Sequence, residues 1–361
     1  MEKINLLVLF GGASSEYEVS LQSAQSILKN LDDEKYDIYP VGITREGAWF
    51  LYSGTFGEIA EDKWVDHPDN RPFLLTPDRA SKALVVSDGG LRPVKIDCVF
   101  PVLHGENGED GSMQGLFELC ELPYVGCGVT SSAICMDKEF AKIITSAASV
   151  KQAAWLKVDR RDFDLDAERC AAAVEGRFSY PVFVKPANTG SSVGISKAKD
   201  KNGLKAALEL AFCYDKKAVV EEFIEGMEIE ISVLGNYGPV TSCCGRILPS
   251  REFYSYESKY IDGTSGQIIP ADIPKEVSDS IAETAKKIFT LLGCEGLARV
   301  DFFVKKGSFE IYFNEINTLP GFTPISMYPK LFEQSGIPYP KLLDRLIGLA
   351  LERDKRGRAD G

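Results

Sequence analysis

The chain has 361 residues, of which 44% are hydrophobic and 26% are charged, and its formal net charge is −12. This length predicts two or three domains, and no apolar run is long enough for membrane insertion. The negative charge argues against non-specific binding to nucleic acid or to an acidic membrane surface.

The first third of the chain alternates strand and helix patterns. Ile4–Phe10 is a continuous apolar run, typical of a buried parallel strand, and Glu16–Asn30 has the periodicity of a helix. Ile38–Ile43 and Cys98–Leu103 have strand patterns, whereas Trp49–Asp97 is irregular and predicts edge strands within an excursion. This alternation predicts an open α/β sheet.

The rest of the chain mixes helices and strands, which predicts α/β and α+β architecture. The predicted helices are Ser131–Ala148, Asn202–Tyr214, Lys275–Gly293 and Lys341–Arg353. The predicted strands are Pro181–Pro186, Ala218–Phe223, Glu228–Leu234, Val240–Ile247, Gly296–Val304 and Phe309–Glu315.

Cysteine usage bears on the compartment and on metal content. Nine cysteines occur without a C-x-x-C pair, and Met1–Gly12 lacks the pattern of a secretory leader. We therefore expect reduced thiols in a cytoplasmic protein. Structural zinc is not expected, because the chain has only two histidines and no cysteine spacing fits a zinc site.

Two predicted strands near the C-terminus carry a cluster of charged and polar side chains. Residues two apart on a strand face the same way, so Arg299 pairs with Asp301, and Glu315 with Asn317. A hairpin with Arg299 opposite Glu315 would bring the four side chains together and would centre the turn on Gly307. All four share one face only if the loop has an odd number of residues or a strand contains a bulge. Three oxygen-bearing side chains and a guanidinium suit the binding of Mg²⁺ and phosphate. The alternative interpretation of the cluster is a surface salt bridge on an edge hairpin.

The segment V-K-P-A-N-T-G-S-S-V-G, residues 184–194, predicts a strand followed by a turn of small residues. Small residues let backbone N–H groups approach an anion, Lys185 adds a point charge, and Ser191 and Ser192 add hydroxyl donors. The Walker A pattern is absent. The segment predicts a phosphate site, with an unliganded Gly/Ser loop as the alternative.

Carboxylates follow the predicted strand Ala218–Phe223. Glu221, Glu222 and Glu228 could accept hydrogen bonds from ribose hydroxyls. The alternative is a solvated acidic run.

Two further segments follow apolar strands, the usual place for ligands in open α/β sheets. In F-G-G-A-S-S-E-Y-E-V-S, residues 10–20, Glu16 either caps the following helix or binds an ammonium group. In H-G-E-N-G-E-D-G, residues 104–111, His104 is either a structural histidine or part of a site, and Glu109 could orient a nearby polar group.

Residues 251–266 lack clear periodicity and predict a long loop, which in a compact domain is usually functional or disordered. Lys259 could neutralise phosphate there, and Tyr260 could donate a hydrogen bond.

Taken in this order, the segments resemble the D-alanine–D-alanine ligase family of the ATP-grasp superfamily. The most specific stretches are S-S-E-Y-E-V-S-L, V-L-H-G-E-N-G-E-D-G-S-M-Q-G, K-P-A-N-T-G-S-S-V-G and N-E-I-N-T-L-P-G-F-T-P-I-S-M-Y-P. The resemblance implies a three-domain ATP-grasp fold with an N-terminal open α/β domain. The implied domains are residues 1–126, 127–221 and 222–361, and the last carries a lid loop at about 251–266.

The resemblance also implies a role for each candidate residue. The implied catalytic residues are Glu16, Ser191, Tyr260, Arg299, Gly321 and Ser326, with His104 and Met327 binding substrate. The implied nucleotide-binding residues are Lys138, Lys185, Ser192, Glu221, Glu228 and Lys259. The implied ligands of two Mg²⁺ ions, for which Mn²⁺ can substitute, are Asp301, Glu315 and Asn317.

The implied activity is ATP-dependent ligation of two D-alanine molecules through an acyl phosphate, for peptidoglycan precursors, by a cytoplasmic homodimer. A D-alanine–D-serine ligase of the glycopeptide-resistance type is the alternative, since such ligases can keep a tyrosine at the position of Tyr260. A non-catalytic ATP-binding regulator is a further alternative. It predicts loss of a metal ligand or of Arg299, and all of these residues are present.

Overall fold

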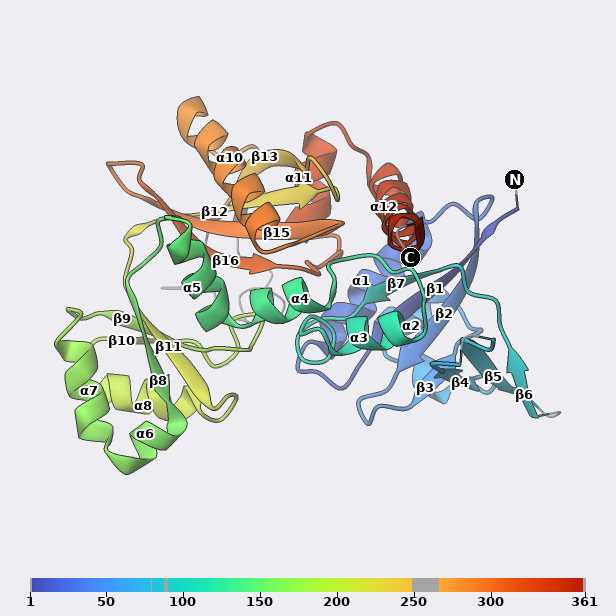
Figure 1. Ribbon diagram of the computed structural model, residues 1–361, viewed down its shortest axis with the longest axis horizontal. Coiled ribbons are helices and arrows are strands. Elements are labelled where there is room, and N and C mark those ends of the chain that lie inside the picture. The colour runs from blue at the N-terminus through green and yellow to red at the C-terminus, as the bar shows by residue number, and fades with distance from the viewer. Residues whose placement is uncertain (1, 79, 88–89, 249–265, 360–361) are drawn as a thin grey trace.

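The computed structural model describes residues 2–78, 80–87, 90–248 and 266–359. These residues form three β-sheets with helices packed against them (Figure 1). The predicted lid at about 251–266, with Lys259 and Tyr260, lies outside the described residues apart from its last position. No helix in the described part of the chain has the length and apolar character that a membrane crossing requires.

The first sheet has seven strands in the order β6-β5-β4-β3-β2-β1-β7. β1 (Ile4–Gly11) is buried along most of its length and runs parallel to β2 (Tyr36–Ile43) and β7 (Cys98–Val102), as the apolar pattern predicts. The predicted excursion supplies an antiparallel edge, which makes the sheet mixed. Its elements are β3 (Trp49–Leu51), α2 (Phe56–Ala60), η1 (Trp64–Asp66), β4 (Arg71–Leu75), β5 (Ala83–Ser87) and β6 (Gly90–Pro93).

The second sheet has four antiparallel strands in the order β10-β9-β11-β8. Its strands are β8 (Trp155–Asp159), β9 (Val182–Pro186), β10 (Ser196–Ala198) and β11 (Lys217–Glu222). Its core is shared with α6 (Arg160–Leu165), α7 (Ala167–Glu175) and α8 (Lys201–Ala211).

The single helix predicted over Ser131–Ala148 is wrong. The chain forms α4 (Val129–Met136) and α5 (Lys138–Ala147), separated at Asp137. The Asp137 side chain accepts hydrogen bonds from the N–H groups of Glu139 and Phe140, a capping arrangement that starts a new helix. Lys138 therefore becomes the first residue of α5, at the positive end of its dipole.

The third sheet has five antiparallel strands in the order β14-β13-β12-β15-β16. They are β12 (Gly226–Leu234), β13 (Val240–Leu248), β14 (Gly266–Ile268), β15 (Leu297–Lys305) and β16 (Ile311–Asn317). The remaining helices are α1 (Tyr17–Asn30), α3 (Ser112–Leu119), α10 (Lys275–Leu291), α11 (Met327–Gln334) and α12 (Tyr339–Ala359).

The two faces of the third sheet serve different purposes. Val300 and Phe302 of β15 pack in one core with Ile288 of α10. Because side chains alternate along a strand, Arg299 and Asp301 point to the opposite face. That face carries the predicted cluster.

The β15–β16 hairpin brings the predicted cluster together in a register that differs from the expected one. Asp301 lies opposite Glu315, and Arg299 lies opposite Asn317. The expected pairing of Arg299 with Glu315 is therefore wrong by two residues, although all four residues do lie on neighbouring stretches of the two strands.

A bulge explains the difference in register. The pairing shifts between Asp301 and Phe302, which lies opposite Phe313, so Asn314 is the extra residue on β16. The predicted bulge is thus confirmed. The turn contains Gly307, as predicted, with a φ of 86° that glycine adopts readily.

The last helix packs against the first sheet. Leu343, Leu346 and Ile347 of α12 are 0–1% exposed and share one core with Leu6 of β1 and Phe100 of β7. The core of the first sheet therefore includes the end of the chain. The domain boundaries 1–126, 127–221 and 222–361 stay a prediction.

Replacing Leu346 tests this shared core. Because Leu346 is fully buried, Leu346→Ala should lower the free energy of unfolding by about 2–5 kcal/mol. Leu165→Ala is the matched control, since Leu165 is 72% exposed and its loss should cost less than about 0.5 kcal/mol. Chemical denaturation followed by circular dichroism measures both, and equal effects would contradict the packing of α12.

Candidate functional site

Glu16 lies at the N-terminal cap of α1, but its side chain makes no capping hydrogen bond. Its carboxylate is buried and accepts a hydrogen bond from the Ser191 hydroxyl. Two glycines leave room for it, because a Cβ added at Gly105 or Gly190 would lie 2.6 or 2.4 Å from Oε2. The helix-cap interpretation is therefore wrong for this side chain, which links the first sheet to the loop after β9.

The loop after β9 is held in an unusual conformation. Ser191 and Ser192 have φ values of 48° and 61°, the left-handed region that residues other than glycine rarely occupy. Asn188 anchors the loop through two hydrogen bonds, of 2.8 and 2.9 Å, to Asp215 Oδ2. Such strained residues cluster at ligand sites, where the surrounding structure maintains them.

His104 follows β7 and lies in the interior. Its Nδ1 is 3.0 Å from the Leu319 carbonyl oxygen and 3.6 Å from Glu109 Oε1, and its Nε2 is 3.3 Å from Ser23 Oγ. Burial alone would lower the pKa of His104, but Glu109 raises it above its ordinary value. Burial raises the pKa of Glu109 to about 7. Glu109 thus contacts a polar neighbour, as the sequence suggested.

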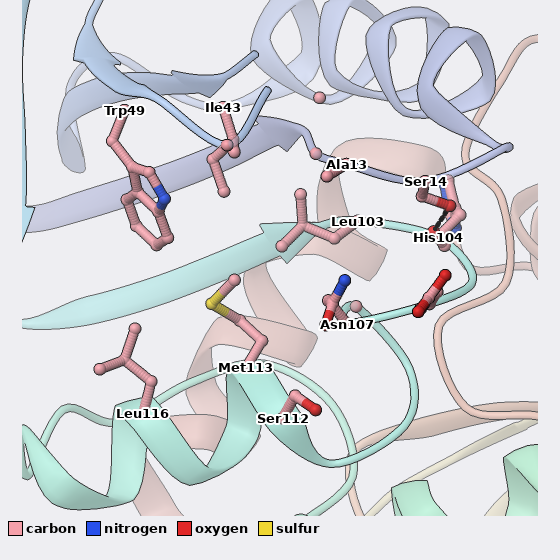
Figure 2. Close-up of a pocket in the computed structure, with 15 residues that line it drawn as sticks. Ala13, Ser14, Ile43, Trp49, Leu103, His104, Asn107, Ser112, Met113 and Leu116 are labelled. Carbon is pink, nitrogen blue, oxygen red and sulfur yellow. Dashed lines mark hydrogen bonds between the residues drawn. The ribbon is translucent and has the colours of Figure 1, made fainter. Parts of the chain in front are cut away.

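A mostly apolar pocket of about 260 Å³ opens beside His104 (Figure 2). Trp49, Met113 and Leu116 lie on its apolar side, and Ser14 lies near His104. The Ser14 hydroxyl donates to the His104 carbonyl at 2.8 Å. No lysine or arginine of the described residues lines this pocket, so it does not suit a phosphate group.

Two lysines form the charged part of the site. Lys138 Nζ donates to the Thr189 carbonyl at 2.7 Å and lies 3.8 Å from Glu315 Oε2. Lys185 Nζ donates to Asn314 Oδ1 at 2.9 Å. Both lysines are buried, and the N-terminus of α5 adds its dipole to their charge. This part of the site therefore favours a polyanion.

Glu221 lies between two lysines, one of which the sequence analysis missed. Its Oε2 is 2.8 Å from Lys185 Nζ, and its Oε1 is 2.9 Å from Lys142 Nζ. Burial alone would raise the pKa of Glu221, but the two lysines lower it to about 2. The available signal for Lys142 was its spacing, because it follows Lys138 by one helical turn.

A cavity of about 270 Å³, lined by Lys185 and Glu221, lies between the second and third sheets. Phe183, Met227 and Phe303 are among its apolar lining, and Glu228 and Ser192 are among its polar lining. An apolar cavity with a few polar groups, next to a polyanion site, suits a planar ring attached to phosphates.

Arg299 and Asp301 form a bidentate ion pair on the face of the third sheet that is turned away from α10. Arg299 Nε and Nη2 each donate to an Asp301 oxygen at 2.8 Å. Asn317 Nδ2 donates to Asp301 Oδ2 at 3.1 Å. Glu230 of β12, which the sequence analysis did not single out, lies 3.1 Å from Arg299 Nε. Its position on the adjacent strand could have identified it.

The donor set fits a divalent cation. Asp301 and Glu315 lie directly opposite on neighbouring strands, where two like charges would attract a cation in addition to Arg299 and Lys138. No cluster of three carboxylate, histidine or cysteine side chains that could hold a metal occurs in the described residues, so the Asn317 amide would complete the set. Two carboxylates and an amide are hard oxygen donors of the kind that Mg²⁺ prefers.

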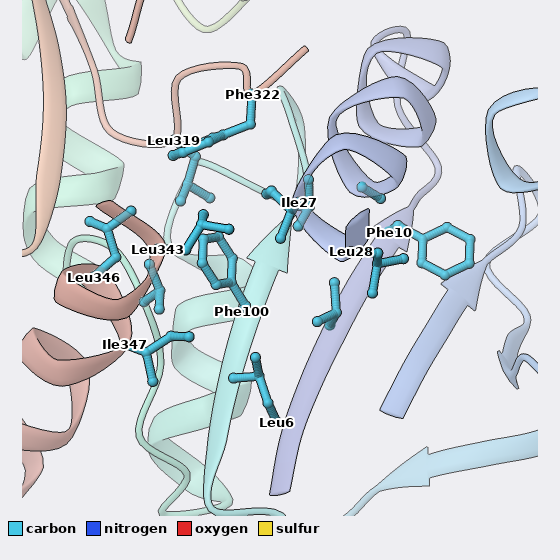
Figure 3. Close-up of a cluster of buried hydrophobic side chains, with 14 of the residues drawn as sticks. Leu6, Phe10, Ile27, Leu28, Phe100, Leu319, Phe322, Leu343, Leu346 and Ile347 are labelled. Atoms are coloured by element: carbon cyan, nitrogen blue, oxygen red, sulfur yellow. The ribbon is translucent and has the colours of Figure 1, made fainter. Parts of the chain in front are cut away.

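The loop between β16 and α11 carries Gly321 and Ser326. Ser326 Oγ accepts from Thr323 N–H at 3.0 Å, and a Cβ at Gly321 would lie 2.8 Å from that same oxygen. Leu319 and Phe322 anchor the loop in the core that contains Leu343, Phe100 and Ile27 (Figure 3). The Met327 side chain is buried against Leu331, so only its backbone could reach a ligand.

The structure therefore brings most of the predicted residues to the junction of the three sheets. Glu16, Ser191, Ser192, His104, Lys138, Lys185, Glu221, Glu228, Arg299, Asp301, Glu315, Asn317, Gly321 and Ser326 lie there or line its cavities. Lys259 and Tyr260 lie outside the described residues.

Comparison with known proteins gives matches along nearly the whole chain. Two family models match, D-ala D-ala ligase N-terminus over residues 5–127 and D-ala D-ala ligase C-terminus over residues 144–348. A D-alanine–D-alanine ligase of Caldicellulosiruptor bescii is 52% identical, covering 99% of this chain and 98% of the relative. One of Acetivibrio thermocellus is 50% identical, covering 98% and 97%.

Two solved structures share the fold. The D-alanine–D-alanine ligase from Coxiella burnetii superposes with a TM-score of 0.88 at 37% identity, covering 99% of this chain and 97% of that one. The VanG D-Ala:D-Ser ligase from Enterococcus faecalis superposes with a TM-score of 0.87 at 41% identity, covering 97% and 100%. With family models, relatives and structures in agreement, the chain belongs to the D-alanine–D-alanine ligase family, and its three sheets form an ATP-grasp fold.

Proposed function

We propose that this chain joins two D-alanine molecules to D-alanyl-D-alanine, with ATP converted to ADP and phosphate. The contact that carries the proposal is the hydrogen bond from Ser191 to Glu16, because it places a buried carboxylate beside the lysine cluster. A carboxylate for an ammonium group and lysines for phosphates are what such a reaction needs in one site. The 52% and 50% identical relatives carry this activity in their names.

In the first step, a carboxylate oxygen of the first D-alanine attacks the γ-phosphorus of ATP, which gives an acyl phosphate and ADP. Glu16 binds the ammonium group of this D-alanine. Lys138 and Lys185 offset the charge of the phosphates, and Glu228 accepts from the ribose. His104 fixes the loop behind the first substrate through its contact with Leu319.

Asp301, Glu315 and Asn317 would hold the two Mg²⁺ ions. These ions, when bound, neutralise charge on the transferring phosphoryl group. A cation bound to Asp301 would weaken the ion pair between Asp301 and Arg299. The Arg299 guanidinium could then bind the substrate.

In the second step, the free amine of the second D-alanine attacks the acyl carbon, the C–O bond to phosphate breaks, and the amine proton leaves with the phosphate. Arg299 and the Gly321 N–H stabilise the oxyanion of the tetrahedral intermediate, where one donor is typically worth about 3–4 kcal/mol. The N-terminus of α11, with Ser326 as its cap residue and Met327 as its first residue, holds the carboxylate of the second D-alanine. Lys259 and Tyr260 would complete the site from the lid.

D-serine as the second substrate is the alternative product class. The observation that favours it is the 41% identity to a D-Ala:D-Ser ligase of known structure. We further propose cytoplasmic location and a homodimer through residues 1–126, in keeping with the production of a peptidoglycan precursor.

A phosphate-release assay tests the activity and the choice of second substrate. Release should require both ATP and D-alanine, and kcat/KM for D-alanine as second substrate should exceed that for D-serine. Phosphate release without any amino acid would favour the non-ligase alternative. A higher kcat/KM with D-serine would assign the chain to the other product class.

Substituting Glu315 tests the metal site. Glu315→Gln should lower kcat at least about a hundredfold, because the loss of one carboxylate weakens the cation that neutralises the phosphoryl group. Circular dichroism should be unchanged. Glu310→Gln is the matched control on the same hairpin, since Glu310 forms an exposed ion pair with Lys151. Near-normal turnover of Glu315→Gln would remove this residue from the metal site.

Substituting Gly190 tests the placement of Glu16. A Cβ at Gly190 would lie 2.4 Å from Glu16 Oε2, so Gly190→Ala should displace the carboxylate and raise KM for D-alanine about tenfold or more. Gly348→Ala, on α12 with nothing near the added Cβ, should leave KM unchanged. Steady-state kinetics at saturating ATP separate the two, and an unchanged KM in Gly190→Ala would contradict the assigned role of Glu16.

A further inference from the structure

A buried lysine that the proposed reaction does not use lies on α5. Lys142 is 1% exposed, which makes it one of the largest fully buried side chains in the described residues. Burying an ammonium group is costly unless an opposite charge lies close to it. A lysine in such a position therefore points to a specific partner.

That partner is Glu221, which Lys142 shares with Lys185. Lys142 Nζ lies 2.9 Å from Glu221 Oε1, and Lys185 Nζ lies 2.8 Å from Oε2. Each carboxylate oxygen therefore has its own ammonium group. Lys185 also donates to Asn314 at 2.9 Å, so its direction is fixed by two contacts.

Only part of this group faces the nucleotide cavity. Glu221, Lys185 and Asn314 line the cavity, whereas Lys142 is absent from its lining in the described residues. Lys142 therefore can influence a bound nucleotide through Glu221, and not by direct contact.

The charge balance around Glu221 indicates a role for Lys142. A phosphate group in the cavity attracts Lys185 away from Glu221. If Lys185 were the only cation beside Glu221, its movement would leave a buried carboxylate uncompensated, which costs several kcal/mol. With Lys142 Nζ 2.9 Å from its other oxygen, Glu221 would stay paired if Lys185 turned toward phosphate.

We propose that Lys142 is a positioning residue of the nucleotide site, which holds Glu221 so that Lys185 is free to bind phosphate. The inference rests on the proposed function, since it takes the ligand of Lys185 to be ATP. Burial lowers the pKa of Lys142, although Glu221 opposes this, so the arrangement depends on the carboxylate.

The competing interpretation is an ion pair that only stabilises the fold. It predicts that loss of Lys142 lowers the thermal midpoint while ATP affinity is unchanged in the folded protein. The positioning role instead predicts a selective loss of ATP affinity, and normal affinity when a substitution keeps a cation beside Glu221.

The experiment measures the Kd of ATP with Mg²⁺ by calorimetry, without D-alanine, in the full chain. Lys142→Met should raise the Kd at least tenfold, while KM for D-alanine at saturating ATP changes less than twofold. Lys142→Arg, which keeps a cation beside Glu221, should bind ATP with a Kd within about threefold of that of the unsubstituted protein. Lys151→Met is the matched control, because Lys151 is half exposed and pairs with Glu310 at 2.6 Å, and its Kd should be unchanged.

Each outcome decides the proposal. An unchanged Kd in folded Lys142→Met, or a Lys142→Arg variant that binds as weakly as Lys142→Met, overturns it. If Lys142→Met does not fold, Lys142→Gln carries the test, where a Kd raised tenfold or more supports the proposal and an unchanged Kd overturns it. Failure of the unsubstituted protein to bind ATP would instead contradict the proposed function, and so is distinguishable.

Discussion

The hydrogen bond from Ser191 to Glu16 joins residues 175 positions apart, which follow strands of different sheets. His104 makes a second long-range link, to the Leu319 carbonyl on the loop before α11. The site therefore exists only where the first sheet, the loop after β9 and the third sheet meet. The core between α12 and β1 matters for the same reason, because it fixes the first sheet against the chain segment that carries Leu319.

The same junction gathers charges that would be costly to bury singly. Glu221 is compensated by Lys142 and Lys185, and Asp301 by Arg299. Lys185 and Arg299, which the proposed reaction uses, are thus already held by a carboxylate before substrate arrives. An anionic substrate then replaces an internal partner, and the dipoles around it need little reorganisation, which is the condition under which electrostatic stabilisation is most effective.

The periodic elements could be predicted from the sequence, and the exceptions have local causes. β1 and α1 followed from an apolar run and a helical repeat. The break at Asp137 did not, because the helical pattern runs through it and only the capping contacts reveal it. Lys142 was missed because a lysine on a helix normally lies in solvent, and its burial depends on Glu221, which is remote in sequence. The resemblance supplied the candidate site residues, but not the ion pairs that hold them.

The bulge in β16 explains why the alternation of side chains along a strand did not predict the hairpin register. Phe313 and Ile316 both belong to the core beneath α10, yet they are three residues apart and would face opposite ways on a regular strand. The extra residue, Asn314, restores both to the core. It also turns two consecutive residues toward the site, so that Asn314 accepts from Lys185 while Glu315 lies opposite Asp301. Without the bulge, a one-residue slip would lose either the core contact between Phe302 and Phe313 or the pairing of the two carboxylates. The irregularity therefore lets a single strand serve the core and the proposed metal site together.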